Sequence, residues 1–426
     1  MIHGSYVRYE GDRTSTPRVR NHPDARAHPV ETARLIIQEV QLGRMIGPFT
    51  PNHSPLPYTR ISPLNIVPKR ESWRLINDLS TPHMNSVNDG IYYMPTKWQL
   101  IQHALQLIVS MGTGCHLGKM DVKSAYRLLP IHHTDWHLFG CIVENLLFID
   151  IYMPFGGRSS GYIWERYAQA MQWILQHKYN IPPTSRWVDD FLFVLDPISS
   201  TSMLMKANDA FNELGVPMDA NKQEGPTTCL VYIGYTLNTI SMTIGTSLNQ
   251  REKVMPLLDE ACGRTISLAN LERLIGKLEF MTLPIRLGRS YMYHMRRALY
   301  IAQRKKKSIV SSMADTMYSV HLNADSKSEM RWWKSAIADD TISSIGLHIP
   351  WHSNDTVGLI QPTSDASEWG CGAYCDGEYI SVEWSDDIKH ITDIESGKRR
   401  NMPLCEAIGV AIAVSTWRHR FAGRRV

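Results

Sequence analysis

Two adjacent carboxylates, Asp189 and Asp190, lie between apolar runs near the middle of the chain. The flanking residues, from Trp187 to Leu195, are mostly aromatic, β-branched or leucine and are bounded by prolines, which is typical of a strand. A tight hairpin with both carboxylates at its tip is the simplest interpretation. Two like charges buried side by side are costly unless a cation lies between them, so the pair favours a metal site. A solvated Asp-Asp turn is the alternative, and it is the commoner role of this dipeptide.

A third carboxylate, Asp121, lies at the end of another short apolar strand, and the aromatic residue Tyr126 follows it. One aspartate on this strand and a pair on a neighbouring hairpin would supply oxygen ligands for two hard divalent cations. Two such ions, about 3.5–4 Å apart, can activate a 3′-hydroxyl group and stabilise a leaving pyrophosphate. Together the three carboxylates therefore indicate metal-assisted nucleotidyl transfer.

Size and composition describe a globular protein with several domains. The 426 residues are too many for one compact core and predict two or three domains. No run of about 18 apolar residues occurs, so we expect no membrane span. Seven scattered cysteines without CxxC spacing favour a reducing compartment, in the cytoplasm or the nucleus. The net charge of +4 permits nucleic-acid binding without requiring it.

The elements around the carboxylates are predicted from periodicity and turn residues. Residues 31–42 read as a helix that ends at Gly43, and residues 64–79 as a β-hairpin. Lys69 and Arg70 lie at the hairpin tip and Arg74 just beyond it, which suits a triphosphate, although a solubilising tip is the alternative. A Gly- and Ser-rich turn over residues 153–161 opens a helix to about residue 177, and a helix N-terminus can hold an anion.

Beyond the Asp-Asp hairpin the sequence predicts another helix, a turn and a hairpin. The helix spans residues 202–214, the turn presents Lys222, and the hairpin pairs residues 229–237 with residues 241–244. Residues 250–301 have helical periodicity. In the last segment a strand ends in Asp365, a Gly-rich strand returns, and Glu406 lies near the start of a helix.

Five motifs in this order resemble the reverse transcriptase–ribonuclease H region of a retroelement polyprotein. They are closest to the DIRS-like group of tyrosine-recombinase retrotransposons. The motifs are Ser62–Lys69, Asn85–Gly90, Met153–Gly156, Trp187–Asp190 and Leu271–Phe280.

The resemblance implies a mixed α/β (α+β) right-hand polymerase: fingers, a ferredoxin-like palm and a helical thumb, followed by a truncated ribonuclease H-like α/β domain. The expected divisions are a flexible N-terminal arm (1–30), fingers and palm (31–245), thumb (246–301), connection (302–355) and incomplete ribonuclease H-like domain (356–426). Further polyprotein domains are expected beyond this chain.

The resemblance also assigns roles to single residues. Asp121, Asp189 and Asp190 would bind two magnesium ions, for which manganese can substitute, and Lys222 would protonate the leaving pyrophosphate. Tyr126 would exclude a ribose 2′-hydroxyl. The remaining residues of the incoming deoxynucleoside triphosphate site would be Lys69, Arg74, Phe155 and Gly156. The residues that grip the primer terminus would be Tyr232, Gly234 and Tyr235.

The implied activity is RNA-directed DNA synthesis on an RNA template with a DNA or RNA primer. Phe155 replaces the glutamine of retroviral enzymes, and Trp187 stands where tyrosine is commoner. For ribonuclease H, Asp365 and Glu406 match the first two carboxylates, but the sequence ends before the strand expected to carry a third. We therefore expect little RNA cleavage.

Two alternatives remain open at this stage. The first is a catalytically inactive retroelement remnant that still binds template–primer. The second is an RNA-dependent RNA polymerase, which usually carries a smaller residue where Tyr126 stands and has no ribonuclease H tail.

Overall fold

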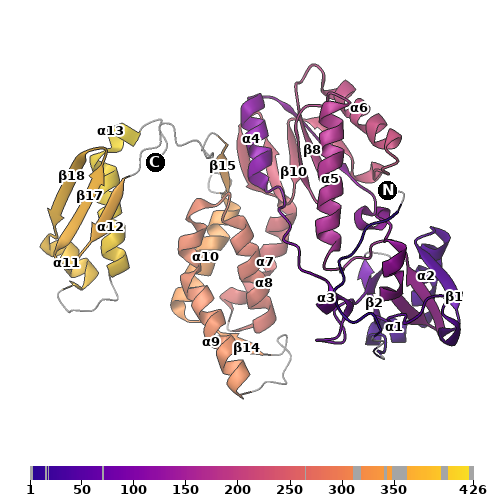
Figure 1. The fold of residues 1–426 in the computed structure, drawn as a ribbon. Helices are drawn as coiled ribbons and strands as arrows, with labels where there is room; N and C mark the ends of the chain where they lie inside the picture. Colours follow the sequence, from indigo (N-terminus) through magenta and orange to yellow (C-terminus); the bar gives the residue numbers. More distant parts are fainter. Residues whose placement is uncertain are drawn as a thin grey trace. The chain divides into compact units, whose positions relative to one another are not determined.

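The computed structural model describes residues 3–14, 17, 19–69, 72–263, 265–309, 318–339, 343–347, 362–394 and 402–421. The chain divides into two compact units, residues 1–348 and residues 349–426, and both combine helices with antiparallel strands (Figure 1). Among the described helices, none is both long enough and apolar enough to cross a membrane.

A four-stranded antiparallel sheet, here called the central sheet, organises the first unit. Its strand order is β7-β8-β4-β9. The strands are β4 (His116–Asp121), β7 (Thr184–Trp187), β8 (Asp190–Leu195) and β9 (Glu224–Thr227). Helix α4 (Ile101–Met111) contacts β7 and β8, and α6 (Ser200–Glu213) contacts β8 and β9. Strand β8 is buried almost throughout, which explains its continuous apolar run.

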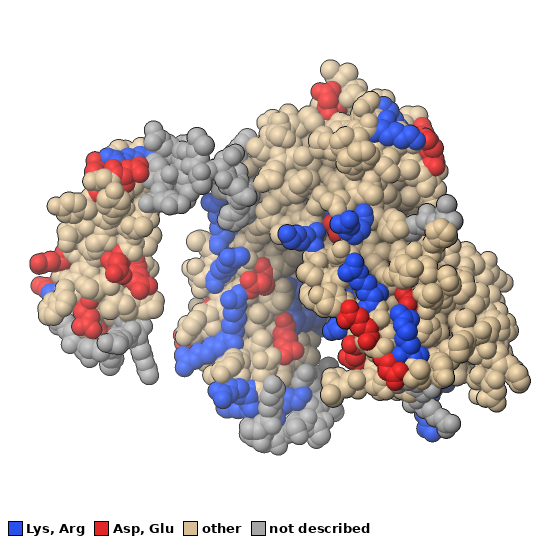
Figure 2. All heavy atoms as spheres, in the orientation of Figure 1, with Lys and Arg blue, Asp and Glu red and all other residues tan. Residues whose placement is uncertain are grey.

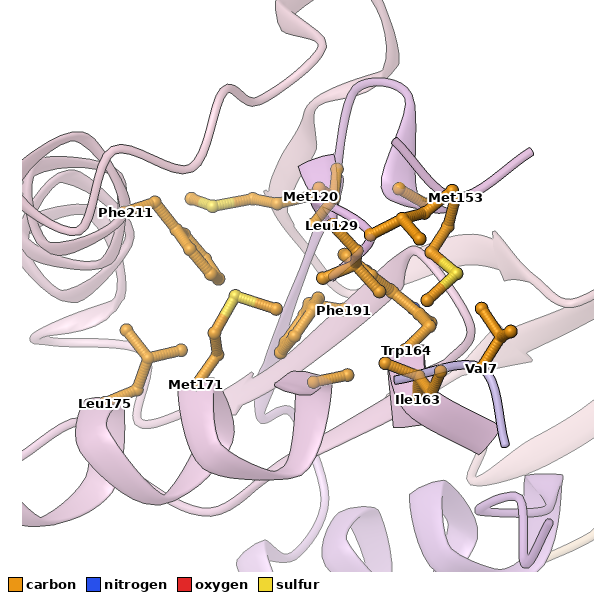
Figure 3. Close-up of a cluster of buried hydrophobic side chains, with 14 of the residues drawn as sticks. Val7, Met120, Leu129, Met153, Ile163, Trp164, Met171, Leu175, Phe191 and Phe211 are labelled. Atoms are coloured by element: carbon orange, nitrogen blue, oxygen red, sulfur yellow. The ribbon is translucent and has the colours of Figure 1, made fainter. Parts of the chain in front are cut away.

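The main core lies between this sheet and helices α5 (Ser160–His177) and α6. Figure 3 shows Trp164, Met171, Phe191 and Phe211 pointing into one interior space. Phe191 and Phe211 meet edge to face, with ring centroids 5.2 Å apart. The predicted helix over residues 162–177 and hairpin around the Asp-Asp pair are therefore present, and packing fixes both.

The N-terminal part of the first unit contains a helical pair and two small sheets. The helices are α1 (Pro23–Ala27) and α2 (Pro29–Gln41), followed later by the short α3 (Val87–Gly90). The strands are β1 (Met45–Phe49), β5 (Gly140–Val143) and β6 (Leu146–Asp150) in one sheet, and β2 (Leu64–Lys69) and β3 (Ser72–Asn77) in the other. The β2–β3 hairpin is the one predicted from the sequence, and α2 ends two residues before Gly43 as expected.

The expectation of a loose arm over residues 1–30 is wrong for its described part. Val7 is fully buried, and its backbone N–H donates to Asp135 Oδ2 at 3.0 Å. Arg13 donates to the other oxygen of Asp135 at 2.8 Å, and Tyr9 forms a backbone bridge with Ile91. A few apolar residues without regular spacing anchor this segment. Hydrophobic periodicity in the sequence therefore could not reveal that the segment is packed against the core.

A buried charge cluster connects α2, β6 and the segment after β4. Arg127 Nη1 lies 2.6 Å from Asp150 Oδ1, and Arg127 Nη2 donates to Glu39 Oε2 at 2.7 Å. Burial raises the pKa of Asp150 to about 6, even though the charge of Arg127 opposes the shift. The folded chain therefore holds this proton more tightly than the unfolded chain, in which an aspartate titrates near 3.8.

The stability contributed by this proton is complete below about pH 4 and is lost as the pH rises through about 6. Asn at position 150 cannot titrate. We compare the free energy of unfolding of the wild type with that of Asp150→Asn at pH 5 and at pH 7. The difference, wild type minus variant, should fall by about 1–2 kcal/mol from pH 5 to pH 7. Urea unfolding at both pH values measures this difference. The variant Asp209→Asn, at an exposed position, is the matched control and should keep the pH dependence of the wild type. If Asp150→Asn also kept that pH dependence, the prediction would be contradicted.

Four helices form a bundle with its own core. They are α7 (Leu248–Cys262), α8 (Leu268–Met281), α9 (Tyr293–Ile309) and α10 (Ala324–Ala338). Within the expected connection over residues 302–355, α9 continues to Ile309, and the short helix expected around Trp332 and Trp333 is the longer α10, whose Trp333 is fully buried in the bundle core. The short strands β13 (Thr265–Ser267) and β14 (Ser319–His321) pair beside it.

A second four-stranded sheet has the order β10-β11-β12-β15. Its strands are β10 (Cys229–Tyr232), β11 (Tyr235–Asn238), β12 (Thr243–Thr246) and β15 (Ser344–Gly346). The expected single strand over residues 229–237 is instead two strands, because Ile233 and Gly234 both have positive φ (40° and 86°) and reverse the chain.

The second unit contains a three-stranded antiparallel sheet covered by helices. The strands are β16 (Thr363–Ala366), β17 (Gly370–Cys375) and β18 (Glu378–Glu383), in that order. The helices are α11 (Asp386–Thr392), α12 (Met402–Thr416) and α13 (Arg418–Phe421). A turn at Asp376 and Gly377, both with positive φ, joins β17 to β18. The expected start of this domain at residue 356 lies outside the described residues.

Candidate active site

The register of the central sheet brings the predicted carboxylates together. Asp121 ends β4 and lies opposite Asp190, the first residue of β8. Just beyond this pair, the backbone N–H of Val122 donates to the carbonyl of Asp189 at 2.9 Å. Asp121 is buried, whereas Asp189 and Asp190 are partly exposed. Three carboxylates from two segments that are distant in sequence therefore meet where the two central strands, β4 and β8, have adjacent ends.

The turn that presents Asp189 is held in an unfavourable conformation. Val188 has φ 53°, in the left-handed region that β-branched residues avoid. Its carbonyl accepts a hydrogen bond from the indole Nε1 of Trp164 at 2.8 Å. Trp164 is fully buried on α5, so the hairpin tip is attached to the core. Such strain persists only where the surroundings impose it.

Burial first, and then repulsion between the carboxylates, govern the electrostatics of Asp189 and Asp190. Burial, and then the charges of Asp189 and Asp121, raise the pKa of Asp190 to about 6. Burial and Asp121 likewise raise the pKa of Asp189. The ammonium of Lys222 donates to Asp121 Oδ1 at 2.8 Å, and this bond raises the pKa of Lys222. Added positive charge would therefore be stabilised here.

These oxygen donors suit a hard divalent cation in their chemistry. Among the described residues, however, no group of three or more His, Cys, Asp or Glu side chains is arranged to hold a metal ion. The ammonium of Lys222 supplies the positive charge beside Asp121 in this structure. The donor set fits magnesium by its chemistry, while a complete coordination shell needs further oxygen ligands.

An aromatic wall stands beside the carboxylates. Tyr126 lies in the short 3-10 helix that follows β4, and it meets Phe155 edge to face with ring centroids 5.3 Å apart. The indole of Trp164 supports Tyr126 from another side, at 6.2 Å. Burial, and then the charge of Asp189, raise the pKa of Tyr126. The phenol ring is thus close enough to the carboxylates to sense their charge.

A pocket of about 360 Å³ opens next to Tyr126. It is lined by Tyr93, Met94, Thr96, Trp98, Tyr126, Gly156, Gly157, Arg158, Ser160 and Gly161. Asn88 holds its floor: its amide donates to the carbonyl of Gly156 and accepts from the backbone N–H of Arg158, at 2.9 and 2.8 Å. Gly156 has φ 95°, which favours glycine. Sequence reasoning noted the segment around Asn88 but missed this bracing role.

The predicted triphosphate ligands are on the β2–β3 hairpin. Lys69 and Arg74 are exposed on the β2–β3 hairpin, and Arg70 lies outside the described residues. In the described part of the chain, no recorded hydrogen bond or ion pair links Lys69 or Arg74 to the three carboxylates. The structure therefore brings Asp121, Asp189, Asp190, Lys222, Tyr126 and Phe155 together and leaves the basic hairpin as a separate element.

The predicted primer-grip residues form the β10–β11 turn. Tyr232 pairs with Tyr235 across it, and a Cβ at Gly234 would lie 2.9 Å from the Phe280 ring. Tyr235 stacks on Phe280, with centroids 4.3 Å apart, and its hydroxyl donates to the Phe280 carbonyl at 2.9 Å. The turn is therefore fixed to helix α8.

In the second unit, the two predicted ribonuclease H carboxylates lie on neighbouring elements. Asp365 is in β16, Glu406 is in α12, and both side chains are exposed. Helix α12 contacts β16, but the described residues contain no third ligand arranged with these two around a metal ion.

Sequence reasoning missed a buried ion pair behind the Asp-Asp hairpin. Arg186 in β7 forms a two-pronged pair with Glu165 in α5, with N–O distances of 2.6 and 2.7 Å. Arg186 also donates from Nε to Gln172 and from its backbone N–H to Gln99, each at 2.9 Å. Only 2% of Arg186 is exposed. An arginine next to a buried strand was the available signal, since such a charge requires a partner.

Comparison with known proteins gives a structural likeness alone. No protein-family model and no curated sequence matches the chain. The foamy viral protease–reverse transcriptase, solved with an RNA/DNA hybrid, has a TM-score of 0.62 at 14% identity, covering 97% of this chain and 49% of that one. Two structures with double-stranded DNA each have a TM-score of 0.60, at 15% and 16% identity, and each covers 96% of this chain.

This chain spans 64% and 78% of the chains solved with double-stranded DNA, and about half of the one solved with the hybrid. At such identity the likeness concerns the fold. With the three carboxylates and the aromatic wall at one edge of the central sheet, the chain has a reverse transcriptase-like fold.

Proposed function

We propose that this chain is an RNA-directed DNA polymerase that adds deoxynucleotides to a primer 3′-hydroxyl group. The observation that carries the proposal is the register of β4 and β8, which sets Asp121 opposite Asp190 with Asp189 beside them. Hydrolases and binding proteins also use paired carboxylates. The combination with Lys222, Tyr126 and a reverse transcriptase-like fold favours nucleotidyl transfer.

In this proposal the central sheet with its helices is the palm, the β1–β3, β5 and β6 region the fingers, and the α7–α10 bundle the thumb. Magnesium, held by Asp121, Asp189 and Asp190, would supply the Lewis acid that activates the primer hydroxyl. The ammonium of Lys222, now hydrogen-bonded to Asp121, provides a proton donor beside the departing pyrophosphate. Lys69 and Arg74 of the exposed basic hairpin would bind the triphosphate.

The proposed partners are an RNA template, a DNA or RNA primer and deoxynucleoside triphosphates. The known neighbours were solved with double-stranded DNA and an RNA/DNA hybrid, which supports a duplex ligand. The order of the motifs favours a DIRS-like retrotransposon as the source. In the second unit, Asp365 and Glu406 would be the first two carboxylates of a ribonuclease H-like site.

The decisive experiment is primer extension on an RNA template with magnesium and deoxynucleotides, comparing the wild type with Asp121→Asn. Extension by the wild type alone supports the proposal. If neither protein extends a primer that both bind, the chain is a binding remnant. Equal extension by both proteins would mean that Asp121 is outside the metal site.

Sugar selection tests the role of Tyr126. Its ring contacts Phe155 and lies near enough to Asp189 to sense its charge, so it would contact the 2′ position of an incoming sugar. Tyr126→Ala removes this barrier, so we expect ribonucleotide incorporation relative to deoxynucleotide incorporation to rise by about tenfold or more. Single-nucleotide insertion kinetics with both sugars measure the ratio. Tyr162→Ala, which removes another partly buried tyrosine packed against the same core, is the control, and an unchanged ratio in Tyr126→Ala would refute the assignment.

A further inference from the structure

The helical bundle contains a second pocket, of about 660 Å³, within the first unit. It lies between helix α9, strand β14 and the first turn of helix α10. Its lining is His294, Arg297, Ala298, Ile301, Ala302, Lys305, Tyr318, Ser319, Val320, His321, Asn323, Asp325 and Ser326. A volume of this size holds a small organic molecule. None of these residues belongs to the candidate active site.

One wall of the pocket is apolar. Ala298, Ile301 and Ala302 follow one another at helical spacing on α9, so they share a face. Val320 and Tyr318 on the β14 side complete this wall. A flat or aliphatic group packed here would be removed from water on several sides.

The rim of the pocket is positively charged. Arg297 and Lys305 lie on α9, His294 and His321 flank them, and Asp325 is the one acidic lining residue. Within the described residues, Arg297 has no ion-pair partner, whereas its neighbour Arg296 is paired with Glu279. Figure 2 shows Lys and Arg side chains gathered over the helical part of the first unit. An anion would therefore meet a cation that has no competing partner among the residues described.

The start of α10 adds backbone donors to this rim. Asn323 caps the helix by accepting from the backbone N–H of Ser326 at 2.9 Å. The free N–H groups of a helix's first turn attract negative charge. Ser326 is 1% exposed and lines the pocket, yet its hydroxyl has no hydrogen-bond partner among the described residues. A buried hydroxyl without a partner is costly, and a bound acceptor would satisfy it.

We propose that this pocket binds a small organic phosphate, a phosphate ester on a flat apolar body. The phosphate would lie between Arg297 and the α10 N-terminus, where Ser326 donates to it. The apolar body would pack against Ile301 and Tyr318. An apolar wall beside a charged rim suits a ligand whose apolar body adjoins its phosphate. The site is separate from the polymerase centre and does not depend on the proposed function.

The test uses the whole chain and three probes: 1-naphthyl phosphate, 1-naphthol and inorganic phosphate. Titration calorimetry should show that 1-naphthyl phosphate binds at least about tenfold more tightly than either fragment. Arg297→Gln should weaken its binding by about tenfold, and Ser326→Ala by about threefold or more. Arg296→Gln is the matched control, since Arg296 is already paired with Glu279, and it should bind normally.

Three results would overturn the proposal. Equal binding to the wild type and to folded Arg297→Gln would place the probe elsewhere on the chain. Equal affinity for inorganic phosphate and 1-naphthyl phosphate would remove the apolar body from the assignment. If a short DNA duplex competes with the probe in the wild type and binds more weakly to Arg297→Gln, that result would make the pocket a nucleic-acid contact instead.

Discussion

Asp189→Asn is expected to reduce primer extension by roughly 10³-fold or more while leaving the fold and template–primer binding intact. The asparagine keeps the shape of the side chain but loses the charge that would hold a metal ion. Loss of several kcal/mol of transition-state stabilisation corresponds to a rate decrease of this size. Stability should be unchanged or slightly higher, because the raised pKa values of Asp189 and Asp190 reflect burial and mutual repulsion that the variant relieves.

Single-turnover extension measures the chemical step of this variant, and duplex binding is measured in parallel. Asp209→Asn, an exposed carboxylate on α6, is the matched control and should extend primers normally. Retained extension by Asp189→Asn would exclude Asp189 from the catalytic centre. A simultaneous loss of duplex binding and of cooperative unfolding would instead indicate a structural role for Asp189.

The second large effect is expected at the buried Arg186–Glu165 pair. Glu165→Gln leaves the guanidinium of Arg186 buried without its counter-charge, which destabilises a protein by about 3–5 kcal/mol. Because Arg186 lies in β7, one residue before Trp187 and the hairpin tip, the carboxylates should also lose their alignment with Tyr126. We therefore expect the rate of extension to fall together with stability, with little change in duplex binding.

A double-mutant cycle separates the pair from its surroundings. Arg186→Met combined with Glu165→Leu should be more stable than either single variant, because no unpaired charge remains buried. The exposed pair of Lys178 and Glu213, at 2.6 Å, is the control, and Glu213→Gln should change stability by less than about 1 kcal/mol. Additive losses in the double variant would show that Arg186 and Glu165 act independently.

The local elements were largely predictable from the sequence. The apolar run after Asp190, the charged turn after Leu64 and the periodicity around Leu271 each indicated the correct kind of element, because hydrophobic spacing records which face is buried. The N-terminal segment was interpreted wrongly, because Val7 and Tyr9 anchor an irregular chain. The length of helix α10 was underestimated, because Trp333 fills a core that forms only when α7, α8 and α9 pack beside it.

By itself, the sequence determined which residue types were present and where strands and turns interrupt the chain, which was enough to select Asp121, Asp189, Asp190 and Tyr126. Only the tertiary structure decided that Asp121 faces Asp190, because strand register depends on pairing across the whole sheet. It also decided that Lys222 reaches Asp121 and that Arg186 needs Glu165. A buried charge pairs with whichever opposite charge the fold places next to it. The order of residues along the chain does not specify that neighbour.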